Sequence, residues 1–292
     1  MDELLRISLL EGQARAMLVK SAALVEEARK IHDLSRTATA ALGRLLTGTA
    51  MLGAMLKSPT DSVTVSIRGN GPMGRLLSVG APDGTVKGYV EHPEVDPERR
   101  NGKLNVGGAV GSEGTLTVIK DMGLKEPYSG QTILVTSEIA EDLTYYFANS
   151  EQVPSSVGLG VLMEKDNTVK CAGGFIVQLM PFAEEKVISR LEENVGKITS
   201  VTKLLEEGYT PQQLLSDLTE GLDLEVTDTM PARFYCNCSK ERVERAVASI
   251  GEKDIREMIG EGKDIEVKCH FCNTAYTYSV EELKSILERS RK

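Results

Sequence analysis

The chain has 292 residues, of which 41% are hydrophobic and 26% are charged, a balance that excludes a wholly disordered chain. Lys and Arg number 34 against 43 Asp and Glu, for a formal net charge of −9. This acidity argues against a protein whose main role is to coat nucleic acid or an anionic membrane. The length allows two domains, or one large domain with an appendage.

Neither a membrane span nor a secretory signal is predicted. The longest uncharged apolar stretch, 45–55, is shorter than the ~20 residues that cross a bilayer. Asp2 and Glu3 stand where a secretory signal would carry positive charge, and no long apolar core follows them. We therefore expect a cytoplasmic protein with no membrane partner and with reduced cysteines.

Charge divides the chain into three parts. Residues 181–230 hold 4 basic against 11 acidic side chains, whereas the counts are 18 against 21 in 1–180 and 12 against 11 in 231–292. We predict a core domain over 1–180, an acidic helical linker over 181–230 and a small cysteine-containing module over 231–292.

The first part is predicted to be α+β, a mixed sheet with helices packed on it. Leucines at helical spacing predict a largely buried helix over 37–56, and a shorter helix is expected over 24–33. A further helix is expected over 138–149, and Gly/Pro/Asp clusters separate the strand-like runs as hairpin turns would. The strands are expected at 14–19, 62–67, 75–79, 86–91, 115–119, 132–135 and, around the turn Asp166–Asn167, within 157–180.

The linker is predicted to be amphipathic helix. Apolar residues recur at helical spacing over 187–205, and Thr210 can cap a further helix with Pro211 at its first position. An apolar stripe under an acidic outer face is not stable alone in water, so these helices must lie against another surface.

The last part contains short elements and few large apolar residues. Ser239 can cap a helix, a second short helix follows Gly251, and strands at 265–268 and 274–278 flank a turn. Residues 279–282 read as a capping box that opens a final helix. A module this small usually needs a staple such as a metal or disulfides.

Four cysteines provide that staple, as the pairs Cys236/Cys238 and Cys269/Cys272 with the segment 239–268 between them. In a reducing compartment two tight pairs predict a Zn²⁺ site in which four thiolates fill all four positions. Such a closed site is structural or regulatory rather than catalytic. His270, between the second pair, is a rival ligand that we place outside the shell.

The sequence leaves two roles open for this site. Zinc keeps thiols as thiolates, the form that peroxide attacks, so oxidation of one pair would remove two ligands and the folding energy of the module. The alternative is a static zinc ribbon that stabilises an adaptor for nucleic acid or protein.

The whole chain resembles the heat-shock protein 33 family of chaperonins. The cysteine spacing, behind an acidic helical linker and an α+β core, carries the resemblance together with several core motifs. These motifs are Arg68–Gly74, Gly107–Gly111, Tyr128–Gly130, Tyr145–Pro154 and Ala172–Pro181.

The resemblance implies an ATP-independent holdase of the stress response, inactive while reduced and zinc-bound, and not an enzyme. It further implies that oxidation forms the redox-active disulfides Cys236–Cys238 and Cys269–Cys272, releases zinc and unfolds the module. The linker then exposes apolar surface that binds unfolding client proteins, and a homodimer forms. No nucleic acid partner is implied.

Other candidate sites are weaker. Gly69–Gly74 matches a dinucleotide-binding pattern, but a strand rather than a helix is expected next, so a hairpin turn is the better interpretation. Cys171 stands alone and is expected to be a small buried hydrophobe. A hydrolase or transferase is disfavoured, since three histidines leave little for acid–base work. We expect His32 and His92 on the surface, and the basic residues 240, 242 and 245 on a solvated face.

Overall fold

The computed structural model describes residues 2–9 and 12–290 and confirms an α+β fold. Contacts divide the chain into two units, Met1–Tyr235 and Cys236–Lys292. The strands of the first unit are β1 (Glu3–Leu9), β2 (Ala14–Lys20), β3 (Ser62–Gly69), β4 (Arg75–Gly80), β5 (Thr85–Val90), β6 (Gly114–Asp121), β7 (Tyr128–Ile133), β8 (Ser155–Met163), β9 (Val169–Leu179), β10 (Leu224–Pro231) and β11 (Arg233–Phe234). Its helices are α1 (Ala22–His32), α2 (Arg36–Ala54), α3 (Val106–Val110), α4 (Ala140–Tyr146), the π-helical turn η2 (Phe147–Glu151), α5 (Glu185–Lys197), α6 (Val201–Glu206) and α7 (Pro211–Leu218).

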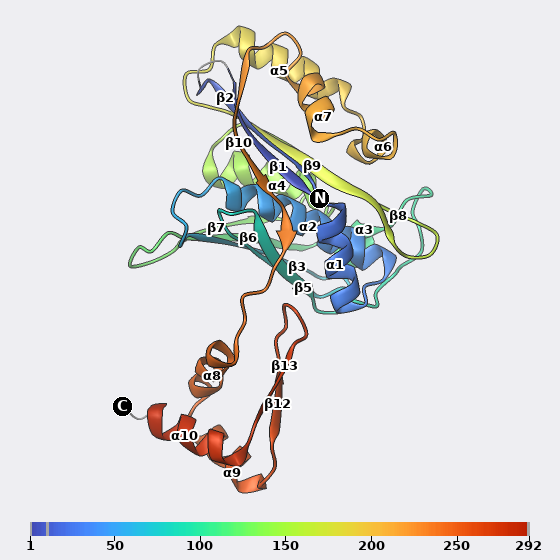
Figure 1. Cartoon of the computed structure of the whole chain (residues 1–292). Coiled ribbons are helices and arrows are strands. Elements are labelled where there is room, and N and C mark those ends of the chain that lie inside the picture. The colour runs from blue at the N-terminus through green and yellow to red at the C-terminus, as the bar shows by residue number, and fades with distance from the viewer. Residues whose placement is uncertain (1, 10–11, 291–292) are drawn as a thin grey trace. The chain divides into compact units, whose positions relative to one another are not determined.

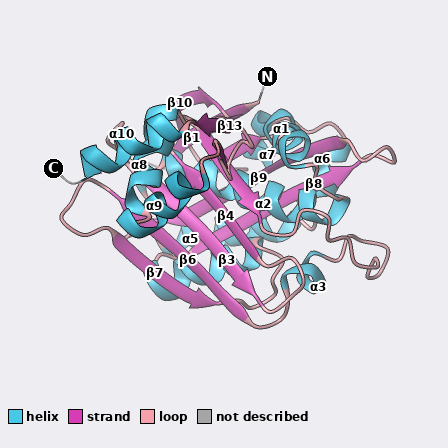
Figure 2. Ribbon diagram, turned by 90° about the horizontal axis from the view of Figure 1, so that it is seen from below, coloured by secondary structure: helices cyan, strands magenta, loops and turns pink. Residues whose placement is uncertain are grey.

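Two sheets enclose the central helix α2 in the first unit (Figure 1). One sheet has the strand order β10-β1-β2-β9-β8 and the other β11-β5-β4-β3-β6-β7. Figure 2 shows β4, β3, β6 and β7 side by side in the second sheet. The pairs are antiparallel except for β11 with β5, which makes this sheet mixed, as predicted.

The helix α2 forms the centre of the core because its sequence is apolar and small on all sides. Every residue from Thr37 to Ala54 except Arg44 is buried. Its glycines allow close approach of the sheets, since a Cβ at Gly53 would lie 2.6 Å from the carbonyl oxygen of Ala81. The hydroxyl of Ser35 accepts the first-turn amide of Ala38 and caps the helix.

The outer face of the five-stranded sheet is also apolar, and α5, α6 and α7 cover it (Figure 1). Side chains alternate along β1, so that Leu4 enters the central core while Leu5 and Ile7 face the helices. Thr210 caps α7 with Pro211 at its first position, as predicted. The linker sequence is therefore a helical layer on a sheet up to Leu218, whereas its last residues belong to the strand β10 and not to a helix as predicted.

Several boundaries differ from those predicted. The strands β1 and β10, which pair with each other, were not predicted. The strand expected at 132–135 lies at 128–133, because the buried carboxylate of Asp142 accepts the amides of Val135, Thr136 and Ser137 and holds this segment as a loop. The helix expected over 138–149 is α4 followed by the π-helical turn.

The second unit contains α8 (Lys240–Ser249), α9 (Glu252–Glu261), the antiparallel hairpin of β12 (Ile265–Lys268) and β13 (Ala275–Tyr278), and α10 (Val280–Ser290). The Ser239 cap is confirmed, and so is the capping box, in which the Ser279 amide donates to the Glu282 carboxylate at 2.8 Å. Six apolar side chains among the described residues form its core: Val247, Ile255, Tyr278, Leu283, Ile286 and Leu287. The predicted three-part division of the chain stays a prediction.

Within residues 2–9 and 12–290, no helix combines the length and the apolar character needed to cross a bilayer.

Candidate metal centre

Two short segments of the second unit bring the four predicted cysteines together. Cys236 and Cys238 lie in the extended segment before α8, while Cys269 and Cys272 lie in the turn between β12 and β13. The antiparallel register of Ile265 with Tyr278 fixes the hairpin. The two cysteines of the turn are thereby held at its tip.

The four sulfur atoms have the spacing of a metal site. All four lie within 4.8 Å of one another, and this group does not include His270. The Sγ atoms of Cys236 and Cys269 are 3.7 Å apart, and those of Cys238 and Cys272 are 3.3 Å apart. Four sulfurs at ~2.3 Å from one tetrahedral ion would be about 3.8 Å apart, so the donors fit Zn²⁺ in number, chemistry and spacing.

The turn that carries Cys269 and Cys272 is built from backbone hydrogen bonds. The amides of Cys272 and Asn273 both donate to the carbonyl of Cys269, at 3.3 and 2.8 Å. Asn273 adopts φ 56°, a left-handed conformation that asparagine tolerates well. The amide of Cys269 donates in turn to Thr274, which closes the turn. In the folded unit, the backbone therefore positions both thiols.

Two hydroxyl groups that the sequence did not single out surround the sulfurs. Tyr276 Oη lies 3.1 Å from Cys238 Sγ, and Thr274 Oγ1 lies 3.2 Å from Cys272 Sγ. The hydrogen bond with Cys238 raises the pKa of the Tyr276 phenol. Burial alone would raise the pKa of Cys272, but its hydrogen bonds with Thr274, Cys238 and Cys269 together outweigh burial and lower that pKa to about 7. Only their position in and after the Cys-x-x-Cys turn could have indicated these residues.

Burial and a neighbouring helix affect the ionisation of the first pair of cysteines. Burial raises the pKa of Cys238, although the hydrogen bond from Tyr276 opposes it. The helix α8 begins directly after Cys238, and its N-terminal end favours negative charge nearby. Lys240 pairs with Glu282 and lies 5.2 Å above the ring of Tyr278, so it belongs to the packing of the unit.

The remaining candidates lie elsewhere. Gly69–Gly74 forms the connection between β3 and β4, the hairpin turn that was predicted. Cys171 is half-buried on β9, and burial raises its pKa, which makes it a poor nucleophile at neutral pH. His92 is exposed, whereas His32 is half-buried and its ring meets that of Phe234 edge to face.

Comparisons with known proteins agree with this architecture over nearly the whole chain. A family model described as Hsp33 protein matches residues 2–279. The chain is 56% identical to the 33 kDa chaperonin of Lachnoclostridium phytofermentans over 99% of both chains, and 51% identical to that of Clostridioides difficile over 98% of this chain and 99% of the relative. A crystal structure of the 33 kDa chaperonin (heat shock protein 33 homolog) of Thermotoga maritima matches with a TM-score of 0.89 and 37% identity, covering 99% of this chain and 98% of that one.

Proposed function

The chain belongs to the Hsp33 family of chaperones, and from this premise we propose that it is a redox-regulated, ATP-independent holdase of the cytoplasm. In this proposal it binds unfolding proteins and keeps them from aggregating. Binding alone accounts for the activity, so we assign no catalytic residues. Zn²⁺ at the four cysteines and two disulfides formed from them control it.

The observation that carries the proposal is the apolar outer face of the five-stranded sheet. Leu5, Ile7 and Phe175 on this face are at most 3% exposed because the linker helices lie on them. The helices contribute buried side chains of their own to the same cluster. These are Val187, Leu191, Val201, Leu214, Leu215 and Leu218. Lifting the helices would expose both halves of this cluster to bind apolar segments of a client.

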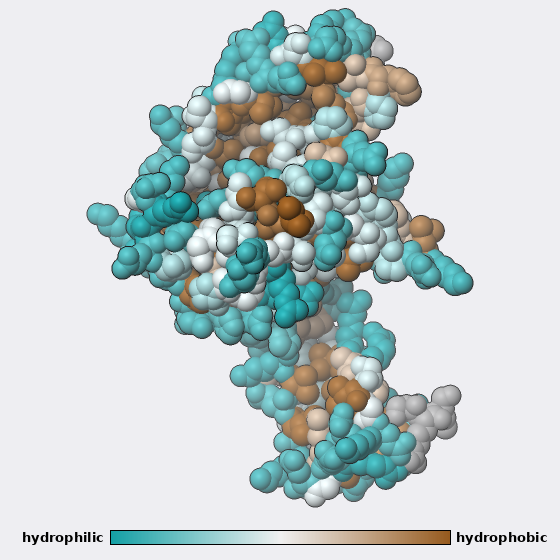
Figure 3. Space-filling model, turned by 180° about the vertical axis from the view of Figure 1, so that it is seen from behind, coloured by the Kyte–Doolittle hydropathy of each residue, from teal (hydrophilic) through white to brown (hydrophobic). Residues whose placement is uncertain are grey.

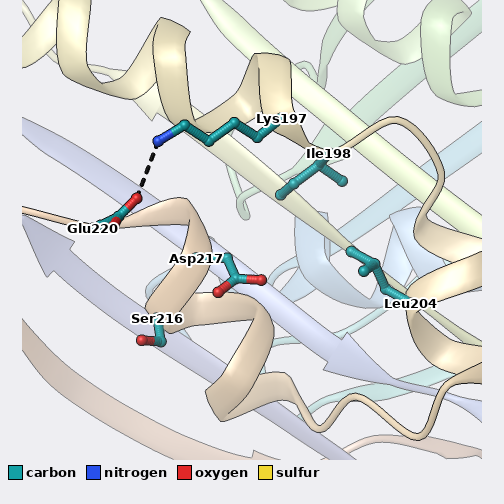
Figure 4. A pocket seen from close by; sticks show the side chains of 6 residues that line it. All are labelled: Lys197, Ile198, Leu204, Ser216, Asp217 and Glu220. Atoms are coloured by element: carbon teal, nitrogen blue, oxygen red, sulfur yellow. Dashed lines mark hydrogen bonds and ion pairs between the residues drawn. The ribbon is translucent and has the colours of Figure 1, made fainter.

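The helical layer leaves a pocket between its helices. A cavity of about 240 Å³ lies between α5, α6 and α7, lined by Ile198 and Leu204 on one side and Asp217 on the other (Figure 4). An ion pair between Lys197 and Glu220 bridges its edge at 3.0 Å and is exposed to solvent, so it stabilises the layer little. Figure 3 shows brown apolar side chains in the region of these helices beneath a teal outer surface. A layer with these properties is suited to detach.

Oxidation supplies the switch in this proposal. Zinc, when bound, would keep the four thiols deprotonated and would hold the two cysteine-containing segments together. Two thiolates of one pair, Cys269 and Cys272 or Cys236 and Cys238, give two electrons to peroxide and form one disulfide. Peroxide is reduced to two hydroxide ions, which become water on protonation. The pair can then no longer serve as ligands.

Loss of the metal ligands would affect the linker because only a short stretch of chain joins the first cysteine pair to it. One residue, Tyr235, separates Cys236 from the two-residue strand β11, and β11 follows β10 after Ala232. The strand β10 lies at the edge of its sheet with seven of its eight residues exposed, and it directly follows the helical layer. When the cysteine unit unfolds, β10 is held by its pairing with β1, and the helices are held by the apolar cluster that they share with the sheet. The uncovered apolar surface would bind clients. The same surface on two copies of the chain would also form a homodimer.

The test is light scattering from a heat-unfolding client protein, with the chaperone added either reduced and zinc-loaded or oxidised by peroxide at mild heat. We expect suppression of scattering by the oxidised form only, reversed by a dithiol. Equal scattering in both states, with zinc still bound after the oxidant, would overturn the proposal and favour the static zinc ribbon.

The matched control is Cys171→Ser, which removes the fifth thiol and leaves the four ligands intact. This variant should switch like the original protein. Cys269→Ser with Cys272→Ser should suppress scattering without any oxidant, because it cannot assemble the site. If that double variant stayed inactive, the metal would not be what restrains the chaperone.

A further inference from the structure

A surface cavity of about 530 Å³ in the first unit combines an apolar floor with cationic walls. Met17 and Leu56 are buried at its base, and Arg6, Arg15 and Lys57 line its sides. It lies where α2 ends, between the paired strands β1 and β2 and the strand β10. All the residues that line it belong to the first unit.

The register of β1 and β2 places the two arginines on one face. Arg6 is opposite Met17, and Ser8 is opposite Arg15, so Arg6 and Arg15 are diagonal neighbours with side chains pointing the same way. Across the other edge, the pairing of β1 with β10 is irregular after Arg6, where Thr227 is the extra residue of a β-bulge. Bulges commonly re-aim side chains beside binding sites.

The three positive side chains of this cavity form no ion pair. Among residues 2–9 and 12–290, no carboxylate oxygen lies within 4 Å of a nitrogen of Arg6, Arg15 or Lys57. The Nε of Arg6 is buried and has no hydrogen-bond partner there, while its Nη2 donates to the carbonyl of Ala54 at the end of α2. Two guanidinium groups and an ammonium group thus converge on one opening.

Neighbouring groups add to the electrostatic character of the cavity. Burial lowers the pKa of Arg15, Glu151 opposes this, and the charge of Arg6 lowers the pKa further. Arg15 uses its Nε to donate to Gln178 at 2.8 Å, which leaves its terminal nitrogens for another acceptor. Asp228, opposite Arg6 on β10, is exposed at the rim and balances one of the three positive charges.

We propose that Arg6, Arg15 and Lys57 form a binding site for a phosphate group, in free form or on a small molecule. A phosphate dianion offers several acceptor oxygens to forked guanidinium donors, and Ser8, which lines the same cavity, has a hydroxyl that can add one more donor. Because Thr227 of β10 lines the same cavity, a phosphate held against it would stabilise the pairing of β10 with β1, whereas the Asp228 carboxylate at the rim opposes an anion.

The experiment titrates the full-length, reduced, zinc-loaded protein with inorganic phosphate, pyrophosphate or acetate at constant ionic strength. Amide NMR shifts of residues 6, 8, 15 and 227 report binding at the cavity. We expect saturation below about 10 mM pyrophosphate, weaker binding of inorganic phosphate and the weakest binding of acetate, as the charges dictate. Absence of saturation, or acetate as tight as pyrophosphate, would overturn the proposal.

Variants locate the site. Arg15→Gln should weaken pyrophosphate binding about tenfold or more, and Lys57→Gln, whose side chain is exposed, by a few-fold. Lys125→Gln removes an equal charge on the exposed loop between β6 and β7 and should change nothing. Arg6→Gln also removes a cap of α2, so its folding is checked by circular dichroism. Equal losses in the Lys125 and Arg15 variants would reduce the effect to net charge and refute the site.

Discussion

The two units of this chain reach stability by different means. Among the described residues, 41 buried apolar side chains form one cluster around α2 in the first unit, whereas six form the core of the second. A unit as small as Cys236–Lys292 buries too small a fraction of its surface to be stable by packing alone. The cysteine cluster therefore has to supply what packing does not, and the second unit depends on the chemical state of four sulfur atoms.

The helical layer of α5, α6 and α7 lies between these extremes. It shares an apolar cluster with the sheet, yet it contains a cavity and faces solvent with acidic side chains. We therefore expect stability to decrease from the core to the layer to the cysteine unit. Each prediction below tests one step of this order, beginning with the largest effect.

Metal removal should separate the units most clearly. A chelator acting on the reduced protein should remove folding free energy on the order of 10 kcal/mol from the second unit alone. Amide NMR should show residues 240–290 losing their dispersion while 14–179 keep theirs. If the second unit kept its dispersed resonances after complete metal removal, its small core would be sufficient and the comparison would fail.

The same leucine-to-alanine truncation should have different effects on unfolding and on chaperone activity in the core and in the layer. Leu52→Ala and Leu218→Ala each remove a side chain that is at most 1% exposed, and each should cost ~2–5 kcal/mol. The first should lower the midpoint of global unfolding. The second should loosen the layer and let the reduced protein suppress client scattering in part. Suppression by both variants, or by neither, would show that the layer is not a separately detachable element.

The sequence predicts local features of this fold better than long-range ones. The helix α2 follows from leucine spacing, and the caps at Thr210 and Ser239 follow from single residues. The strand β10 has seven exposed residues and pairs with β1 from the opposite end of the first unit's sequence, so neither alternation nor turn signals indicate it. The four-cysteine cluster was predictable because ligand chemistry demands proximity, whereas Tyr276 and Thr274 are close only through the hairpin geometry.

Removal of a buried side-chain amide in the layer should destabilise the protein more than removal of an exposed one. Asn194 is fully buried on α5 and donates to the carbonyls of Leu218 and Glu220, at 3.2 and 3.0 Å, which ties α5 to the end of α7. Asn194→Ala leaves the buried carbonyl of Leu218 and the part-buried carbonyl of Glu220 without this donor and should destabilise the layer by ~1–3 kcal/mol, seen as faster hydrogen exchange in α5 and α7.

Asn149→Ala is the matched control, because it removes one exposed amide that donates to the carbonyl of Tyr145 at 3.0 Å. Its effect on exchange should be within ~0.5 kcal/mol, as is usual for surface substitutions. An effect as large as that of the buried variant would mean that Asn194 does not tie the layer together.

The smallest expected effect concerns a serine helix cap, which occurs in the layer and in the cysteine unit. Ser200 Oγ accepts the amide of Lys203 at 3.2 Å in the layer, and Ser239 Oγ accepts the amide of Arg242 at 3.3 Å directly after Cys238. Each serine-to-alanine substitution should cost ~1 kcal/mol of local helix stability. Because folding of the second unit is coupled to metal binding, Ser239→Ala should weaken zinc affinity about fivefold, while Ser200→Ala should leave it unchanged. Competition with a chromogenic chelator measures both, and equal zinc affinity in the two variants would show that the cysteine unit keeps its fold independently of its metal.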